Sequence, residues 1–205
     1  PLLFAYDVIH GFRTVYPISI AQACSFNTNL VNEAARMAAA EATASGLNWT
    51  FSPMVDVARD PRWGRVSEGY GEDPFVNSAF CVATVKGYQG EDLTAPDTLA
   101  ACLKHYVGYS ESMAGLDYAY TDISDRSMWE TYLPPFKAGV DAGVATVMSG
   151  FNDINGVPAV CNTFYLKDVL RKRWGFDGAV VSDWGAIQQL KNQGFSSDPL
   201  IGGVA

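Results

Sequence analysis

The hydrophobic pattern of the chain alternates between short apolar runs and longer segments with helical spacing, and this alternation limits the possible folds. The strand-like runs are residues 2–6, 47–55, 99–105, 144–149 and 178–182, and the helix-like segments that follow them are 29–45, 75–87, 127–142, 163–173 and 186–192. Such an order predicts five βα units with parallel strands. An open doubly wound sheet and part of a (β/α)₈ barrel both fit it.

Individual helices also carry start and stop signals. One predicted helix opens on the polar residues Asn27 and Thr28 and has these residues at helical spacing: Leu30, Ala34, Met37, Ala38 and Glu41. The next begins at Asp73, with Pro74 in the first turn, and ends at Gly87. An aspartate followed by proline is typical of a helix N-terminus, because the side chain caps free amides and proline lacks one.

Composition limits the class of protein. The 205 residues are 48% hydrophobic and 18% charged, which excludes a disordered chain. No apolar run reaches the roughly 18 residues of a membrane span, and no linker divides the sequence, so we expect one domain over 1–205 and no membrane partner. A net charge of −8 argues against nucleic acid and favours a neutral or cationic small substrate.

The sequence predicts no cofactor. It has two histidines and four widely spaced cysteines, so a zinc cluster is not expected. We interpret the cysteines as buried small hydrophobes rather than disulfide partners: Cys24, Cys81, Cys102 and Cys161. No glycine-rich phosphate loop is present, which argues against a nucleotide.

Polar residues follow the predicted strands at the end where βα folds gather their functional groups. In chain order they are Asp7, Asp56 with the loop 58–65, Lys104 and His105, the segment 149–153, and Asp183 with Trp184. Each could simply cap a helix or stabilise a loop. Five such positions in succession predict a common site.

Asp183 is the sharpest candidate, because the apolar run before it would hold its carboxylate rigidly and Trp184 lies beside it. A carboxylate nucleophile next to an aromatic surface suits the chemistry of a sugar ring. The alternative is that Asp183 caps the helix beginning at Ala186.

The other candidates allow several readings. Lys104 and His105 could form a Schiff base and transfer protons, or could donate hydrogen bonds to hydroxyl groups. The loop 58–65 contributes Arg59, Arg62 and Arg65, and acidic neighbours could absorb them in a salt-bridge network: Glu68, Glu72 and Asp73.

With these residues in view, the sequence resembles glycoside hydrolase family 3, especially its periplasmic β-glucosidase branch. The stretches that carry the resemblance are FAYDVIHG at 4–11, SPMVDVARDPRWGRVSEGYGEDP at 52–74, KHYVGY at 104–109 and LKDVLRKRWGFDGAVVSDWGAI at 166–187. They lie in order and cover the chain to about residue 195.

The resemblance implies a retaining β-glycosidase with a (β/α)₈ first domain, of which this chain holds an incomplete part. It makes Asp183 the nucleophile toward terminal β-D-glucosyl residues of β-glucosides or cello-oligosaccharides, and it implies a periplasmic or secreted enzyme. The implied sugar-binding residues are Asp7, which accepts from hydroxyls, the donors Arg65, Lys104 and His105, and Met148 and Trp184, which line the subsite.

The sequence departs from the family pattern at several positions. Phe151 replaces a tyrosine that often orients the nucleophile, and Gly115 replaces an arginine of some members. No histidine follows His105, which excludes the branch with a histidine acid/base. The glutamate acid/base of glucosidase-type members belongs to a second, α/β-sandwich domain, which we expect to be absent here. If the chain acts alone, candidates are Glu68, Glu72 and Glu111.

Three alternatives remain at this stage. The chain could be a weakly active or inactive sugar-binding fragment, whose exposed strand edges would favour a homodimer. It could instead be a β-xylosidase of the same family. A Schiff-base lyase that uses Lys104 is the third.

Overall fold

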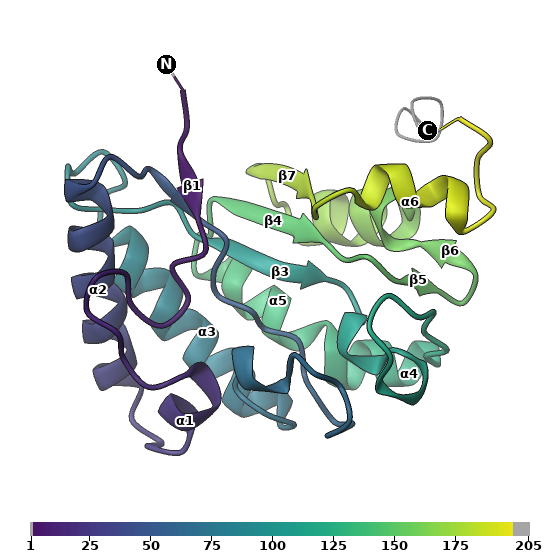
Figure 1. Cartoon of the computed structure of the whole chain (residues 1–205), viewed down its shortest axis with the longest axis horizontal. Helices are drawn as coiled ribbons and strands as arrows, with labels where there is room; N and C mark the ends of the chain where they lie inside the picture. The colour runs from purple at the N-terminus through teal and green to yellow at the C-terminus, as the bar shows by residue number, and fades with distance from the viewer. Residues whose placement is uncertain (1, 199–205) are drawn as a thin grey trace.

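The computed structural model describes residues 2–198 and shows a curved sheet of parallel strands in chain order (Figure 1). The strands are β1 (Ala5–Tyr6), β2 (Trp49–Thr50), β3 (Cys102–Tyr106), β4 (Thr146–Ser149) and β7 (Ala179–Ser182). β1 pairs with β2, and β3 with β4 and then β7, while parallel bridges at Trp49–Ala100 and Met54–Lys104 join the two groups. Because a doubly wound sheet would reverse the strand order, the sequential order supports an open part of a (β/α) barrel.

Helices connect these strands, and Figure 1 shows α2, α3 and α5 lying along one side of the sheet. The helices are α1 (Ser19–Ala23), α2 (Thr28–Ala44), α3 (Pro74–Gln89), α4 (Asp125–Ser127), α5 (Pro134–Asp141) and α6 (Ala186–Asn192), with π-helical segments at Met128–Tyr132 and Phe164–Arg173. A hairpin of β5 (Asp153–Ile154) and β6 (Val157–Pro158) follows β4, and the sequence pattern did not predict it. Within residues 2–198, no helix has the length and apolar character needed to cross a bilayer.

The helix caps formed as predicted. The Asn27 side chain accepts hydrogen bonds from the amides of Asn29 and Leu30 at 3.1 and 3.3 Å, and that of Asp73 accepts from Phe75 and Val76 at 2.8 and 2.9 Å. These bonds satisfy amides that have no partner within the helix.

The buried face of α2 agrees with the predicted spacing at Ala38 and differs from it at two larger residues. Leu30 and Met37 are both 55% exposed, and the buried side chains are mostly small: Val31, Ala35, Ala38, Ala39 and Ala42. The reason is the close approach of α3. A Cβ added to Gly87 would lie 2.5 Å from the carbonyl oxygen of Asn32 and 2.6 Å from Cβ of Ala35. Gly87 therefore lies inside α3 as a contact residue, and the predicted helix end there is wrong.

The helical segment over 127–142 is divided, as its two prolines predict. Met128–Tyr132 forms a π-helical turn, and Pro134 and Pro135 occupy the first positions of α5. Proline is tolerated there because the first amides of a helix have no intrahelical acceptor.

The four cysteines are free thiols in differing environments. Cys81 and Cys102 are fully buried, as expected, and burial raises the pKa of the Cys102 thiol to about 12. Cys24 is exposed and Cys161 is half-buried, so the prediction of four buried hydrophobes is wrong for these two.

Close packing at Gly87 can be tested by substitution. We expect Gly87→Ala to lower the free energy of unfolding by about 1–3 kcal/mol through overpacking, although alanine is favoured over glycine by ~1 kcal/mol in an unconstrained helix. Urea unfolding measures the change. Gly64→Ala is the control, because nothing lies within 4 Å of its added Cβ. An unchanged or increased stability of Gly87→Ala would contradict the proposed contact.

Candidate active site

An irregularity in β3 brings Lys104 and His105 to the same side of the sheet. The pairing of β3 with β4 shifts register between Leu103 and Tyr106, and both of these residues pack into the core on the helix side. Strict alternation would send residues three apart to opposite faces. The shift therefore leaves two consecutive polar residues facing away from the helices. Both lie within β3, at the end of the strand predicted over 99–105.

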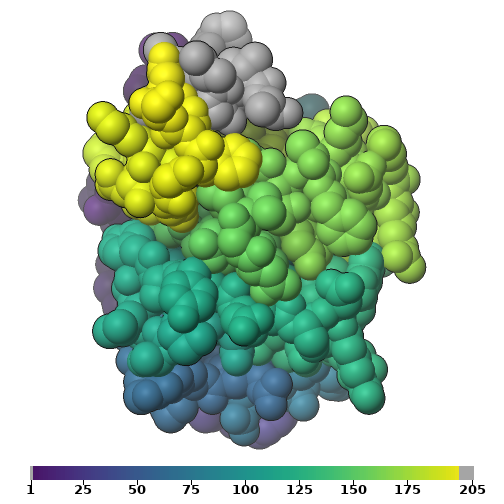
Figure 2. Space-filling view, turned by 90° about the vertical axis from the view of Figure 1, so that its right-hand side faces the viewer, coloured from purple at the N-terminus to yellow at the C-terminus, as the bar shows by residue number. Residues whose placement is uncertain are grey.

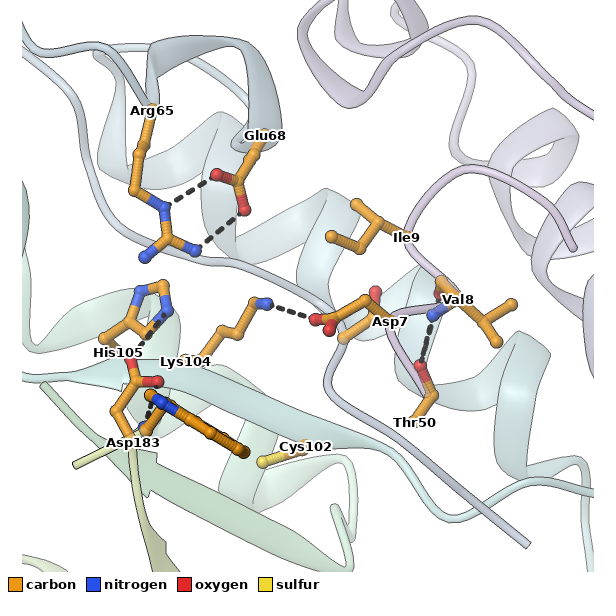
Figure 3. A network of polar contacts seen from close by, with 12 residues as sticks. Asp7, Val8, Ile9, Thr50, Arg65, Glu68, Cys102, Lys104, His105 and Asp183 are labelled. Atoms are coloured by element: carbon orange, nitrogen blue, oxygen red, sulfur yellow. Dashed lines mark hydrogen bonds and ion pairs between the residues drawn. The ribbon is translucent and has the colours of Figure 1, made fainter. Parts of the chain in front are cut away.

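Asp7 and Lys104 form an ion pair across the sheet. Nζ of Lys104 donates to Oδ1 of Asp7 at 2.9 Å (Figure 3). Lys104 is 4% exposed, while the side chain of Asp7 is 57% exposed, so the carboxylate remains accessible to a ligand. Thr50 holds the backbone after Asp7 in place, because its Oγ1 accepts from the amide of Val8 at 3.1 Å.

His105 lies between two carboxylates. Its Nδ1 is 2.8 Å from Oδ2 of Asp56, and its Nε2 is 3.4 Å from Oδ2 of Asp183. Asp56 reaches this position because the extended chain after β2 pairs with β3, where the amide of Val55 donates to the carbonyl of Lys104 at 2.8 Å. Burial holds the pKa of His105 well below its usual value, so the imidazole is neutral at physiological pH.

Asp183 follows β7, and its side chain is 13% exposed. Oδ1 accepts from the amide of Trp184 at 2.6 Å, whereas Oδ2 is buried without a hydrogen bond. The N-cap of α6 is Gly185, and no side chain caps this helix. Asp183 therefore does not act as the N-cap of the Ala186 helix, and one carboxylate oxygen is left for chemistry.

Arg65 lies opposite Lys104 and His105, as Figure 3 shows. Its Nε and Nη2 donate to the two carboxylate oxygens of Glu68 at 2.6 and 2.9 Å, and its guanidinium stacks over the ring of Tyr109. Burial raises the pKa of Glu68, but the hydrogen bonds and charge of Arg65 outweigh it, and the net pKa is lowered. The pair is a bidentate, charge-assisted contact.

The other arginines of this loop have separate partners. Arg62 binds Asp60 at 2.6 Å, and Asp73 caps α3, so neither residue enters the site. Arg59 lies beside Tyr132, whose hydroxyl donates to Glu111. Arg62 therefore acts in a salt bridge, as the alternative interpretation of this loop stated. Arg65 forms a salt bridge and also lies in the candidate site.

A small core formed by loops supports these side chains. It packs residues from the segments after β2, β3, β4 and β7, and it consists of Met54, Ala58, Trp63, Tyr109, Phe151 and Ala186. Tyr109 is its centre, because its ring meets those of His105 and Phe151 edge-on and its hydroxyl donates to Asp117. Figure 2 shows the surface on this side of the molecule as bands in chain order, from blue at the bottom through teal and green to yellow at the top.

Phe151 and Gly115, the two positions that depart from the family pattern, both lie in closely packed surroundings. Phe151 is buried against Tyr109 and Tyr118. Gly115 has a φ of +71°, and a Cβ there would lie 2.8 Å from Cβ of Arg62. No larger side chain fits at this glycine without movement of the loop after β2.

The structure brings Asp7, Arg65, Lys104, His105 and Asp183 together. Of the remaining predicted site residues, Met148 is buried within β4 and Trp184 is 92% exposed beside Asp183. Sequence reasoning missed the contacts of two further residues, Asp56 and Tyr109, whereas the salt-bridge alternative included the pair of Arg65 and Glu68. Asp56 was visible as a strand-end carboxylate, but nothing in the sequence paired it with His105. Among residues 2–198, no group of three or more histidine, cysteine or acidic side chains could hold a metal ion.

Three comparisons with known proteins agree on one family. Residues 1–200 match the model of the glycosyl hydrolase family 3 N terminal domain. A periplasmic beta-glucosidase of Salmonella typhimurium is 47% identical over 97% of this chain and 26% of its own length, and a beta-xylosidase of Formosa agariphila is 43% identical over 92% and 27%. The crystal structure of beta-glucosidase from Listeria innocua superposes with a TM-score of 0.93 at 46% identity, covering 97% of this chain and 28% of that one.

The chain thus spans about a quarter of the length of the relatives it matches. The structural likeness agrees with the barrel-type strand order and rules out the doubly wound alternative. A match over almost every residue, with nearly half of them identical to one relative, identifies the chain as a member of glycosyl hydrolase family 3.

Proposed function

We propose that this chain carries the nucleophile and the sugar-binding residues of a retaining β-glycosidase of the β-glucosidase type. The observation that carries the proposal is the carboxylate of Asp183, whose Oδ2 is buried without a hydrogen bond beside His105. An ionised oxygen without donors is a better nucleophile than one held by several hydrogen bonds. The beta-glucosidases among its relatives support the same activity.

In this mechanism, Oδ2 of Asp183 attacks the anomeric carbon while the leaving-group oxygen takes a proton from an acid. The bond from carbon to the leaving oxygen breaks, a covalent glycosyl-enzyme forms, and water then releases the sugar. Asp7 accepts from sugar hydroxyls, while Lys104 and Arg65 donate. Trp184 contributes apolar surface at the edge of the subsite, and Met148, which is only 5% exposed, contributes a much smaller area.

We assign the acid/base to the α/β-sandwich domain that the family resemblance implies. A general acid must hold a proton and reach the leaving-group oxygen, and the surroundings of the three candidates in this chain do not suit that role. Arg65 lowers the pKa of Glu68 below its usual value despite burial, Glu111 accepts from the hydroxyl of Tyr132, and Glu72 is exposed. The periplasmic relative supports a periplasmic or secreted location.

The role of Asp183 can be tested by trapping. We expect a 2-deoxy-2-fluoro-β-glucoside to form a stable adduct at Asp183, found by peptide mass spectrometry, because the fluorine slows breakdown of the glycosyl-enzyme. Asp183→Asn should lower kcat by about 10⁴-fold or more, as for other nucleophiles, and Asp177→Asn, an exposed aspartate before β7, should not. A label on another carboxylate would refute the assignment.

The preferred sugar is a separate question. Faster hydrolysis of aryl β-xylosides than of β-glucosides would make the protein a β-xylosidase.

Lys104 offers a second test. We expect Lys104→Met to lower kcat/KM about 10- to 100-fold, since a charge-assisted hydrogen bond contributes about 1.5–3 kcal/mol, while the fluoroglucoside still labels Asp183. The exposed Lys167→Met serves as the matched control. Reduction with borohydride in the presence of substrate distinguishes the Schiff-base alternative, because only that mechanism adds mass to Lys104.

A further inference from the structure

The two ring nitrogens of His105 face carboxylates on opposite sides, but a neutral imidazole has only one proton. Nδ1 is 2.8 Å from Oδ2 of Asp56, and Nε2 is 3.4 Å from Oδ2 of Asp183. Both His105 and Asp56 have side chains that are 1% exposed, so water does not decide where the proton lies. The position of the proton determines whether Nε2 donates or accepts on the side of the proposed sugar site.

The hydrogen bonds around Asp56 favour the proton on Nδ1. Its Oδ2 accepts from the backbone amide of His105 at 2.9 Å and also faces Nδ1 at 2.8 Å, so the oxygen that meets the imidazole already acts as an acceptor. Its Oδ1 is buried without a partner, and a proton placed there would find no acceptor. Asp56 is therefore arranged as an acceptor for Nδ1–H.

Charged neighbours support the same state. Arg65 and Lys104 stabilise an ionised Asp56 and disfavour a charged His105, whereas Glu68 acts in the opposite direction on both. Asp183 also favours protonation of His105, and the uncharged ring edge of Tyr109 packs against the imidazole. Burial raises the pKa of Asp56 to about 7. Above that pH the pair consists of one carboxylate and one neutral imidazole.

We propose that Asp56 is a positioning residue that holds the proton of His105 on Nδ1, so that Nε2 accepts a hydrogen bond from a sugar hydroxyl. This differs from the donor role that the family resemblance implies for His105. The consequence for Asp183 is direct. With no proton on Nε2, its Oδ2 receives no hydrogen bond from His105, so the lone pairs of that oxygen stay free for attack. The contact of Nε2 with a sugar hydroxyl and this catalytic consequence rest on the proposed function; the placement of the proton does not.

The proton position can be measured without any activity. In protein labelled with nitrogen-15 in its histidine rings, the signals of His105 are identified by their loss in His105→Gln. Above pH ~8, where an unperturbed histidine is neutral, we expect Nδ1 to show the chemical shift of a protonated nitrogen and Nε2 that of an unprotonated one. The reverse assignment would overturn the proposal.

The variant Asp56→Asn tests the effect on the reaction. Its amide oxygen can still accept both donors, but it carries no charge. We expect kcat/KM to fall about 10- to 100-fold, the loss associated with one buried charge-assisted hydrogen bond, mainly through kcat. The loss should be larger above pH 7 than below it, because the wild-type residue has a pKa of about 7 and asparagine does not titrate.

Asp60→Asn is the matched control, since Asp60 lies in the same loop and pairs only with Arg62 among the described side chains of residues 2–198. We expect its pH profile to equal that of the wild type. If Asp56→Asn lowers activity equally at all pH values, Asp56 has a merely structural role and the proposal is refuted. If the wild type cleaves no β-glycoside, the proposed function fails, and the nitrogen shifts of His105 still decide the position of the proton.

Discussion

The site depends on the register shift within β3. A regular strand would turn either Lys104 or His105 toward the helices, where an uncompensated polar group would be placed among apolar side chains. Because Leu103 and Tyr106 both pack into the helix-side core, the two residues between them face the other side together. The hydrophobic anchoring of two neighbours thus determines the direction of two functional groups.

Because the polar side chains of β3 are buried, each of them needs a hydrogen-bond partner. Lys104 and His105 are almost completely removed from water, and each lies against a carboxylate from an earlier strand: Asp7 after β1 and Asp56 after β2. A buried polar group without a partner is strongly destabilising, so these contacts belong to the stability of the sheet as well as to its chemistry. Asp183 is the exception, since its Oδ2 is buried without a hydrogen bond.

The fold was predictable to the level of elements. Apolar runs separated by helical segments predicted five parallel strands, and the caps Asn27 and Asp73 begin their helices as expected. The side chains that pack were harder to predict. In α2 the sequence offers both large and small apolar residues, and only the close approach of Gly87 in α3 explains why the alanines are buried while Leu30 is exposed.

The sequence by itself determined the chemical inventory: a carboxylate after each of three strands, and Lys104 and His105 in a fourth. The spacing of apolar residues shows where each strand ends, because strands and helices differ in the period with which side chains return to one face. Tertiary structure alone decided which groups meet. Asp56 and His105 are 49 positions apart, and their contact depends on the extended chain after β2 pairing with β3. No local pattern encodes such a pairing, because it arises from the register between strands.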